Sequence, residues 1–202
     1  MIFISHRCNT SAELKNTPIE YGIEVDIRSN GNNLIVQHDP FSTGEIFSEW
    51  LTHYRHGTLI LNIKEEGLEA RLIDLMKEHQ IADYFFLDQS FPFLIKWSNL
   101  GEHRCAIRVS EYESVENAFT LAGKVEWVWV DCFTHFALMG KDARRLQEMG
   151  FKLCLVSPEL HGRPFDTEIV NLVSLLHERS IVPDAICTKH PEFWQACFNK
   201  ID

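Results

Sequence analysis

The sequence has no apolar run of the roughly 18 residues that a membrane-spanning helix needs. Its start also lacks the basic stretch and apolar core of a secretory signal. Positive charge is scarce, because 19 Lys and Arg face 29 Asp and Glu for a net charge of −10. This balance excludes bulk electrostatic attraction to nucleic acid or to an anionic membrane. We therefore expect a cytoplasmic protein with no nucleic-acid partner and no integral membrane association.

The six cysteines lack the C-x-x-C spacing of zinc and redox sites. Cys154, for example, lies in an apolar run, as small buried hydrophobic residues do in a reducing compartment. Cys8 differs because it follows His6 and Arg7 at the end of a strand-like segment. We interpret it as a core or loop residue and not as a nucleophile. Neither a disulfide framework nor a zinc centre is expected.

No linker rich in Gly, Pro or Ser and no internal repeat divides the chain, so we expect a single domain over residues 1–202. Short β-branched and aromatic runs alternate with amphipathic segments. Strands are expected at 2–5, 22–28 with 34–37, 58–63, 84–87, 104–109, 125–130, 152–156 and 184–187. Helices are expected at 11–20, 45–54, 66–79, 91–100, 112–122, 137–149, 166–179 and 190–198.

Eight such alternations in an α/β chain predict a compact (β/α)8 TIM barrel. About 25 residues per unit is tight for this fold, which typically takes some 250 residues, and the first two units look the most abbreviated. An open doubly wound sheet is the alternative, although no Gly-rich phosphate loop follows the first strand.

The segment from Glu24 to Asp39 combines two acids at positions i and i+2 with an Asn-Gly turn and a second apolar run. Side chains two apart on a strand share a face, so Glu24 and Asp26 point the same way. Neighbouring buried carboxylates raise each other's pKa unless a cation lies between them. Hard oxygen ligands suit Mg²⁺ or Ca²⁺ better than zinc. The alternative is that Glu24 and Asp26 are exposed to solvent on an edge strand, which would give the same sequence pattern.

Other expected strand ends carry His6, Arg7, His38 and Lys64. Together with the two acids, they supply two proton carriers, two metal-type carboxylates and two fixed cations. This set suits chemistry at a phosphate, where cations hold the charge and imidazoles move protons.

Later strands of the predicted barrel end in Arg108, Glu159 and Lys189, which we predict to bind substrate. Strand ends of a barrel face one mouth, so the two cations of this set, Arg108 and Lys189, would join the same site. For Glu159, as for Asp88 and Asp131, simple contact of a strand end with water explains the polarity equally well.

Several spaced motifs resemble the glycerophosphodiester phosphodiesterase family, within the wider group of phospholipase-C-like phosphodiesterase barrels. They are SHR at 5–7, GIEVDIR at 22–28 with its Asn-Gly turn, LIVQHD at 34–39 and LNIK at 61–64. The likeness covers about the first third of the chain. It implies metal-assisted cleavage of a phosphodiester, often by a substrate hydroxyl that attacks phosphorus to give a cyclic phosphate, which water then opens.

By this resemblance, His6 and His38 would be the general acid–base pair, and Arg7 and Lys64 would hold the phosphate. Glu24 and Asp26 would bind the divalent cation. Two positions depart from the family pattern. Cys8 replaces a glycine, and Asn62 replaces the third acidic metal ligand. The amide oxygen of Asn62 still suits a hard cation but carries no negative charge, which should weaken metal affinity.

The leading hypothesis is a Mg²⁺- or Ca²⁺-dependent phosphodiesterase acting on a small-molecule diester of glycerol, inositol or a sugar. Cys8 and Asn62 favour a rival, an inactive barrel that binds a phosphorylated ligand. A third possibility is a metal-independent lyase that stops at the cyclic phosphate, with Arg7 or Lys64 replacing the cation. The sequence leaves the alcohol and the oligomeric state open.

Overall fold

The computed structural model describes residues 1–200, and their contacts divide the chain into two compact units. The N-terminal unit is Ser5–Cys105, and the C-terminal unit combines Met1–Ile4 with Ala106–Asp202. Each unit is described separately below. The single domain expected over residues 1–202 stays a prediction.

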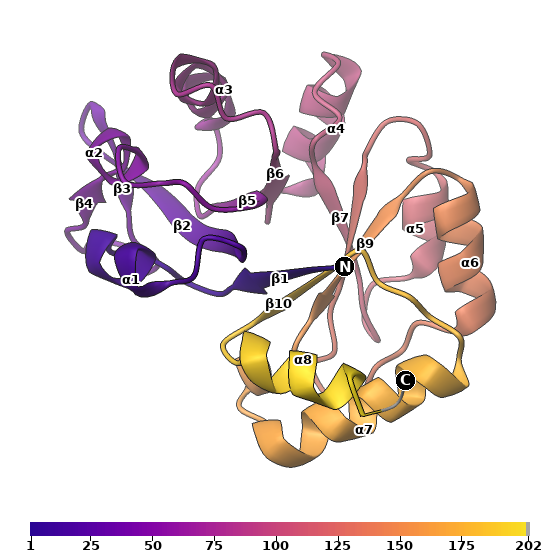
Figure 1. The fold of residues 1–202 in the computed structure, drawn as a ribbon. Coiled ribbons are helices and arrows are strands. Elements are labelled where there is room, and N and C mark those ends of the chain that lie inside the picture. The colour runs from indigo at the N-terminus through magenta and orange to yellow at the C-terminus, as the bar shows by residue number, and fades with distance from the viewer. Residues whose placement is uncertain (201–202) are drawn as a thin grey trace. The chain divides into compact units, whose positions relative to one another are not determined.

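In the N-terminal unit, five strands pair in the order β4-β3-β2-β5-β6. Their bounds are β2 (Gly22–Asn30), β3 (Asn33–Val36), β4 (Glu45–Ile46), β5 (Leu59–Ile63) and β6 (Tyr84–Leu87) (Figure 1). Strands β2, β5 and β6 are parallel, whereas β3 returns antiparallel to β2 through a two-residue turn. Gly31 begins that turn at φ +60°, a left-handed conformation that glycine adopts without a steric cost.

The helices of this unit are α1 (Ser11–Asn16), α2 (Phe47–Leu51), α3 (Glu69–Glu78) and α4 (Phe91–Asn99). The first two are short, as expected from the abbreviated first units. Helix α1 starts with a capping box, in which the Thr10 hydroxyl accepts from the Glu13 backbone N–H and the Glu13 carboxylate accepts from Thr10. This cap fixes the chain immediately after the SHR motif.

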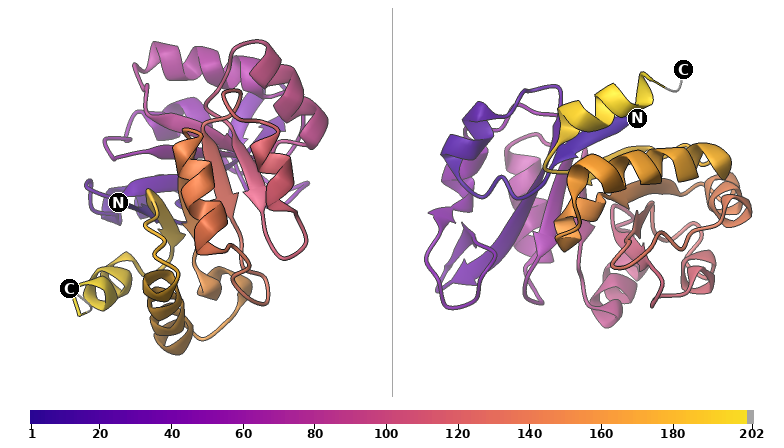
Figure 2. Two further views of the ribbon diagram at one scale, coloured as in Figure 1. Left: turned by 90° about the vertical axis from the view of Figure 1, so that its right-hand side faces the viewer. Right: turned by 90° about the horizontal axis from the view of Figure 1, so that it is seen from below.

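In the C-terminal unit, strands follow the order β1-β10-β9-β8-β7, and β7 to β10 are parallel. They are β1 (Ile2–Ser5), β7 (Ala106–Val109), β8 (Trp127–Val130), β9 (Lys152–Val156) and β10 (Ala185–Thr188). Helices α5 (Val115–Phe119), α6 (Gly140–Glu148), α7 (Phe165–Glu178) and α8 (Pro191–Phe198) alternate with them, and a 3₁₀ helix, η1 (Pro158–His161), follows β9 (Figure 2).

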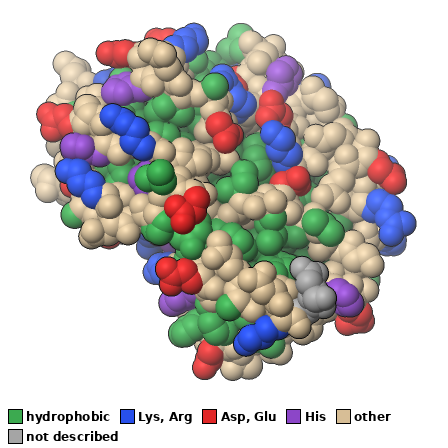
Figure 3. All heavy atoms as spheres, viewed as in Figure 1, with side chains coloured by type: hydrophobic (Ala, Val, Ile, Leu, Met, Phe, Trp, Pro, Cys, Tyr) green, Lys and Arg blue, Asp and Glu red, His purple; other side chains and the backbone are tan. Residues whose placement is uncertain are grey.

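The predicted alternation of strands and helices is confirmed, with ends that shift by a few residues, and the fold is mixed α/β. The strand expected at 104–109 begins at Ala106, because Cys105 forms only an isolated bridge to Phe86. Within the described residues, no helix is long and apolar enough to cross a membrane. Acidic and basic side chains are interspersed on the face that Figure 3 shows, without a large patch of one sign.

The interior strands are almost wholly apolar, which makes their polar exceptions informative. All five residues of β5 are buried, and Asn62 is the single polar one among them. On β2, Glu24 and Asp26 are fully buried between Ile23, Val25 and Ile27. Burying a charge is costly unless other groups compensate it, so these three side chains mark a candidate site.

Candidate active site

The two carboxylates of β2 are held by donors from the neighbouring strand and from the loop after β1. Glu24 Oε1 accepts from Asn62 Nδ2 at 2.8 Å, and its Oε2 accepts from the backbone N–H of Arg7 at 2.7 Å. Asn9 clasps Asp26, since its Nδ2 donates to Asp26 Oδ2 at 2.7 Å and its Oδ1 accepts from the Asp26 backbone N–H at 3.0 Å. Asp26 and Asn62 are register partners across the parallel β2–β5 pair.

Two cationic side chains lie against Asp26. Lys64 Nζ is 3.2 Å from Asp26 Oδ1 and 3.4 Å from Asp88 Oδ2, and Arg7 Nε is 3.7 Å from Asp26 Oδ2. Arg7 and Asp88 both have left-handed backbones, at φ +57° and +59°. Such conformations cost a non-glycine residue about 1–2 kcal/mol and concentrate at functional sites.

Both predicted histidines reach this cluster. His38 Nε2 is 2.6 Å from Arg7 Nη2, and His38 Nδ1 is 2.8 Å from Asp39 Oδ1. Because a guanidinium can only donate, Nε2 is the acceptor, and Nδ1 carries the proton and donates a hydrogen bond to Asp39. On the other side, His6 Nε2 lies 3.7 Å from Glu24 Oε2. The structure therefore brings together the six residues that the motifs predict for the site: His6, Arg7, Glu24, Asp26, His38 and Lys64.

Glu24 and Asp26 are two neighbouring buried carboxylates, and this raises the pKa of Glu24. Burial, and then the neighbouring Asp26 carboxylate, raise the pKa of Glu24 from 4.5 to about 7. Hydrogen bonds from Asn62 and the Arg7 backbone, and the charge of Lys64, work in the opposite direction but do not cancel the effect.

The donors present fit a divalent cation. Asn62 Oδ1 and Asp26 Oδ1 are buried without a hydrogen-bond donor, and Lys64 approaches the latter as an ion pair only. With Glu24, they offer hard oxygen ligands on adjacent strands, the type that Mg²⁺ and Ca²⁺ prefer. Within the described residues, no group of three or more His, Cys, Asp or Glu side chains could hold a metal. A cation here would therefore depend on a neutral amide, and modest affinity is expected.

The Glu24→Gln variant should remove a pH dependence of stability in metal-free buffer. The native Glu24 keeps its proton to about pH 7, whereas the unfolded chain releases it near pH 4.5, so wild-type stability falls as the pH rises between these values. The fall amounts to roughly 3 kcal/mol. Urea unfolding with EDTA measures the free energy of unfolding at pH 5 and pH 8. Relative to the wild type, the variant should be more stable at pH 8 than at pH 5. Glu20→Gln, at an exposed position of the same unit, is the control. If the free energies of unfolding of variant and wild type differed by the same amount at both pH values, the raised pKa of Glu24 would be contradicted.

Cys8 is confirmed as a packing residue. It is buried, and burial raises the pKa of its thiol to about 11, so the reactive thiolate is scarce at neutral pH. Its backbone instead supports the site, because its N–H donates to the Glu24 carbonyl at 3.0 Å and its own carbonyl accepts from Trp50 Nε1 at 3.2 Å.

Two participating residues are absent from the sequence-based prediction. Asn9 holds Asp26, and Asp39 holds His38 Nδ1. The adjacency of Asp39 to His38 is visible in the sequence, as is the position of Asn9 between the SHR motif and the Thr10 cap. Neither position by itself identifies the group that the side chain contacts.

The residues predicted to bind substrate belong to the C-terminal unit, where their local contacts are well defined. Glu159 accepts from Thr188 Oγ1 at 2.5 Å, from the Lys189 backbone N–H at 3.0 Å and from the Ser157 hydroxyl. These bonds tie η1 to the end of β10, which is a structural role. Substrate contact by Glu159 and Lys189 stays a prediction.

Arg108 belongs to a second polar cluster of the C-terminal unit. Asp131 is almost fully buried and accepts from Arg108, from His161 Nε2 and, at 3.3 Å, from Trp129 Nε1. The ring of the partly exposed Phe133 lies 4.6 Å from that of His161, between centroids. Asp131 thus fixes the side chains of Arg108 on β7 and His161 on η1.

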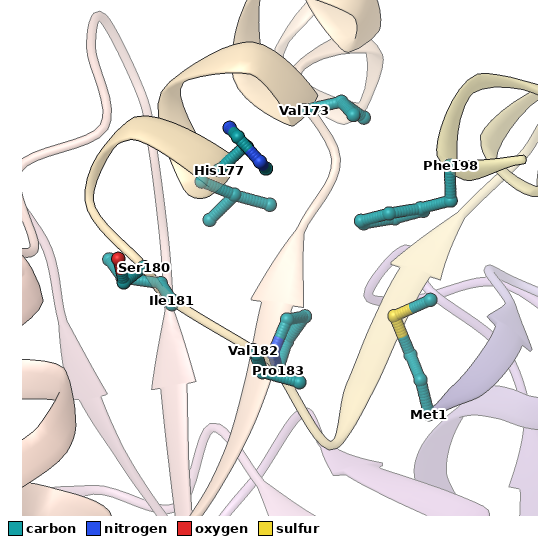
Figure 4. A pocket seen from close by; sticks show the side chains of 9 residues that line it. Met1, Val173, His177, Ser180, Ile181, Val182, Pro183 and Phe198 are labelled. Carbon is teal, nitrogen blue, oxygen red and sulfur yellow. The ribbon is translucent and has the colours of Figure 1, made fainter. Parts of the chain in front are cut away.

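The C-terminal unit also contains an apolar pocket of about 430 Å³. Val173, Leu176 and Phe198 line it together with Met1. Figure 4 shows the Val173 and Phe198 side chains on their helices and Met1 at the start of β1. No residue predicted for phosphate chemistry borders this pocket.

No protein-family model and no curated protein matches the sequence. Solved structures do match. A glycerophosphodiester phosphodiesterase from Agrobacterium tumefaciens shares 15% identity over 98% of this chain and 99% of its own, with a TM-score of 0.63. A putative glycerophosphoryl diester phosphodiesterase from the same organism shares 14% over 99% and 98%, with a TM-score of 0.67. One from Parabacteroides distasonis shares 12% over 99% and 86%, with a TM-score of 0.68.

The chain therefore has a fold similar to that of glycerophosphodiester phosphodiesterases along nearly its whole length. A tryptophan synthase alpha-subunit mutant from Pyrococcus furiosus also matches, with a TM-score of 0.51 and 11% identity. Because one fold supports unrelated reactions, the function must be argued from the site.

Proposed function

We propose that the protein is a metal-dependent phosphodiesterase that cleaves a small phosphodiester of glycerol, inositol or a sugar by His/His general acid–base catalysis. The observation that carries the proposal is the convergence of both histidines on the Arg7–Glu24–Asp26 cluster. The likeness to solved phosphodiesterase structures supports it.

The side chains divide the chemistry among them. Arg7 and Lys64 bind the negative oxygens of the phosphate and hold the phosphorus in place. His38, neutral and with its Nε2 lone pair directed outward from Asp39, takes the proton of the attacking hydroxyl. His6, next to the Glu24 carboxylate, delivers a proton to the leaving alcohol oxygen.

Glu24, Asp26 and Asn62 would hold the cation, Mg²⁺ or Ca²⁺, which neutralises charge on the phosphate oxygens when bound. In this proposal the eight β–α units close into a (β/α)8 barrel, and Arg108, Glu159 and Lys189 contact the substrate alcohol. A metal-independent lyase that ends at a cyclic phosphate is the second candidate. The ion pair of Lys64 with Asp26 favours it, since Lys64 could take over the role of the cation.

Hydrolysis of glycerophosphodiesters and bis(p-nitrophenyl) phosphate, followed by ³¹P NMR with and without EDTA, tests the proposal. Metal-dependent release of a phosphomonoester is the expected result. An accumulating cyclic phosphate that forms equally with EDTA would instead identify the lyase. Binding of a phosphorylated ligand without turnover of any diester would identify an inactive barrel.

A further inference from the structure

The general base of the proposed reaction is occupied in the free protein. Arg7 Nη2 donates to His38 Nε2 at 2.6 Å, so the lone pair that must accept the substrate proton already has a partner. Asp39 accepts a hydrogen bond from the other ring nitrogen, Nδ1, and so fixes this tautomer. While the guanidinium stays in place, His38 cannot take a proton from any hydroxyl.

The Arg7 guanidinium can move away from His38 without unfolding the loop that follows β1. Arg7 is anchored through its backbone N–H to Glu24, and its Nε faces Asp26 at 3.7 Å. Only the side chain therefore needs to move, and its planar guanidinium swings as one group while the backbone stays anchored. The side chains of Arg7 and His38 are 42% and 37% exposed, so an anion can approach both from solvent.

We propose that Arg7 is a latch on His38 that the substrate phosphate opens. A phosphate carries negative charge and offers two oxygens that a guanidinium can bind through two parallel hydrogen bonds, whereas the neutral imidazole nitrogen offers a single lone pair. Binding the phosphate draws Nη2 away and frees the lone pair next to the attacking hydroxyl. The latch rests on the proposed function, because it presumes that His38 is the base.

The groups facing His38 support this exchange. Asp39 contacts Nδ1, and Arg28 Nε holds the His38 backbone carbonyl at 3.0 Å, so the ring keeps its place when Arg7 leaves. Asp39 also stays ionised, because the hydrogen bond from His38 and the charges of Arg7 and Arg28 lower its pKa. The consequence is selective activation, in which His38 acts as a base only while phosphate is bound.

Histidine ¹⁵N NMR at a fixed pH, with inorganic phosphate as the probe, tests the latch. The His38 signals are assigned by comparison with His38→Asn, and ³¹P line width reports binding independently. In the wild type, the His38 Nε2 resonance should move as phosphate saturates the site. In Arg7→Gln, it should start at a displaced position and move little even at high phosphate.

Lys64→Gln is the matched control, because it also removes a phosphate-binding cation but leaves the Arg7–His38 bond intact. Its free resonance should coincide with that of the wild type, and the full shift should need more phosphate. Phosphate binding without movement of the His38 signal, or the same movement in Arg7→Gln, would overturn the latch and leave the phosphodiesterase proposal standing. A wild-type protein that neither binds phosphate nor hydrolyses a diester would overturn the latch and the phosphodiesterase proposal together.

Discussion

Replacing His38 with alanine is expected to lower kcat for a glycerophosphodiester by about 10²- to 10⁴-fold, the range that a positioned general base contributes. The effect should fall on kcat more than on KM, because the proton moves only in the transition state, while Arg7 and Lys64 bind the phosphate in the ground state as well. Steady-state kinetics over a range of substrate concentrations measure the two separately.

His53→Ala provides the control for this substitution. His53 is exposed in the same unit, and no predicted role falls on it. Its replacement should leave kcat unchanged, and thermal unfolding should show that both variants are folded. Equal rates for wild type and His38→Ala would remove His38 from the mechanism and, with it, the reason for the Arg7 latch.

The architecture could be predicted from local patterns because buried parallel strands are apolar throughout. Hydrophobic runs alone predict strand β5 and helix α3 to within a few residues. The central residues of the candidate site could also be predicted from the sequence. Carboxylates two apart on β2 must share a face, and motif order joins them to His6, His38 and Lys64.

What local patterns could not predict depends on contacts between distant segments. The clasp of Asn9 on Asp26 joins residues 17 positions apart, and the Arg7–His38 bond joins residues 31 apart. The left-handed backbone of Arg7 is held by its N–H bond to Glu24, which no single-residue preference encodes. The same holds for the bond between Glu159 and Thr188, which joins residues 29 positions apart.

Removing divalent cations is expected to abolish turnover and to lower the thermal stability of the wild-type protein. A cation near Glu24, Asp26 and Asn62 would contribute several kcal/mol to transition-state stabilisation, which corresponds to more than about 10²-fold in rate. It would also stabilise the native state by about 2.7 kcal/mol at a concentration 100 times its dissociation constant. Rates and melting temperatures with EDTA, and then with added Mg²⁺ or Ca²⁺, measure both effects.

Asp26→Asn should lose the response of the melting temperature to added cation, because the carboxylate between Lys64 and Asn9 is replaced by a neutral amide. Asp74→Asn is the matched control, since Asp74 is 80% exposed on α3 and should leave the response intact. A wild-type protein whose rate and melting temperature ignore both EDTA and added cation would show that Lys64 and Arg7 suffice to hold the phosphate. The buried oxygens of Asp26 and Asn62 would then need a different explanation, such as bound water, and the cyclic-phosphate lyase would become the better account of the site.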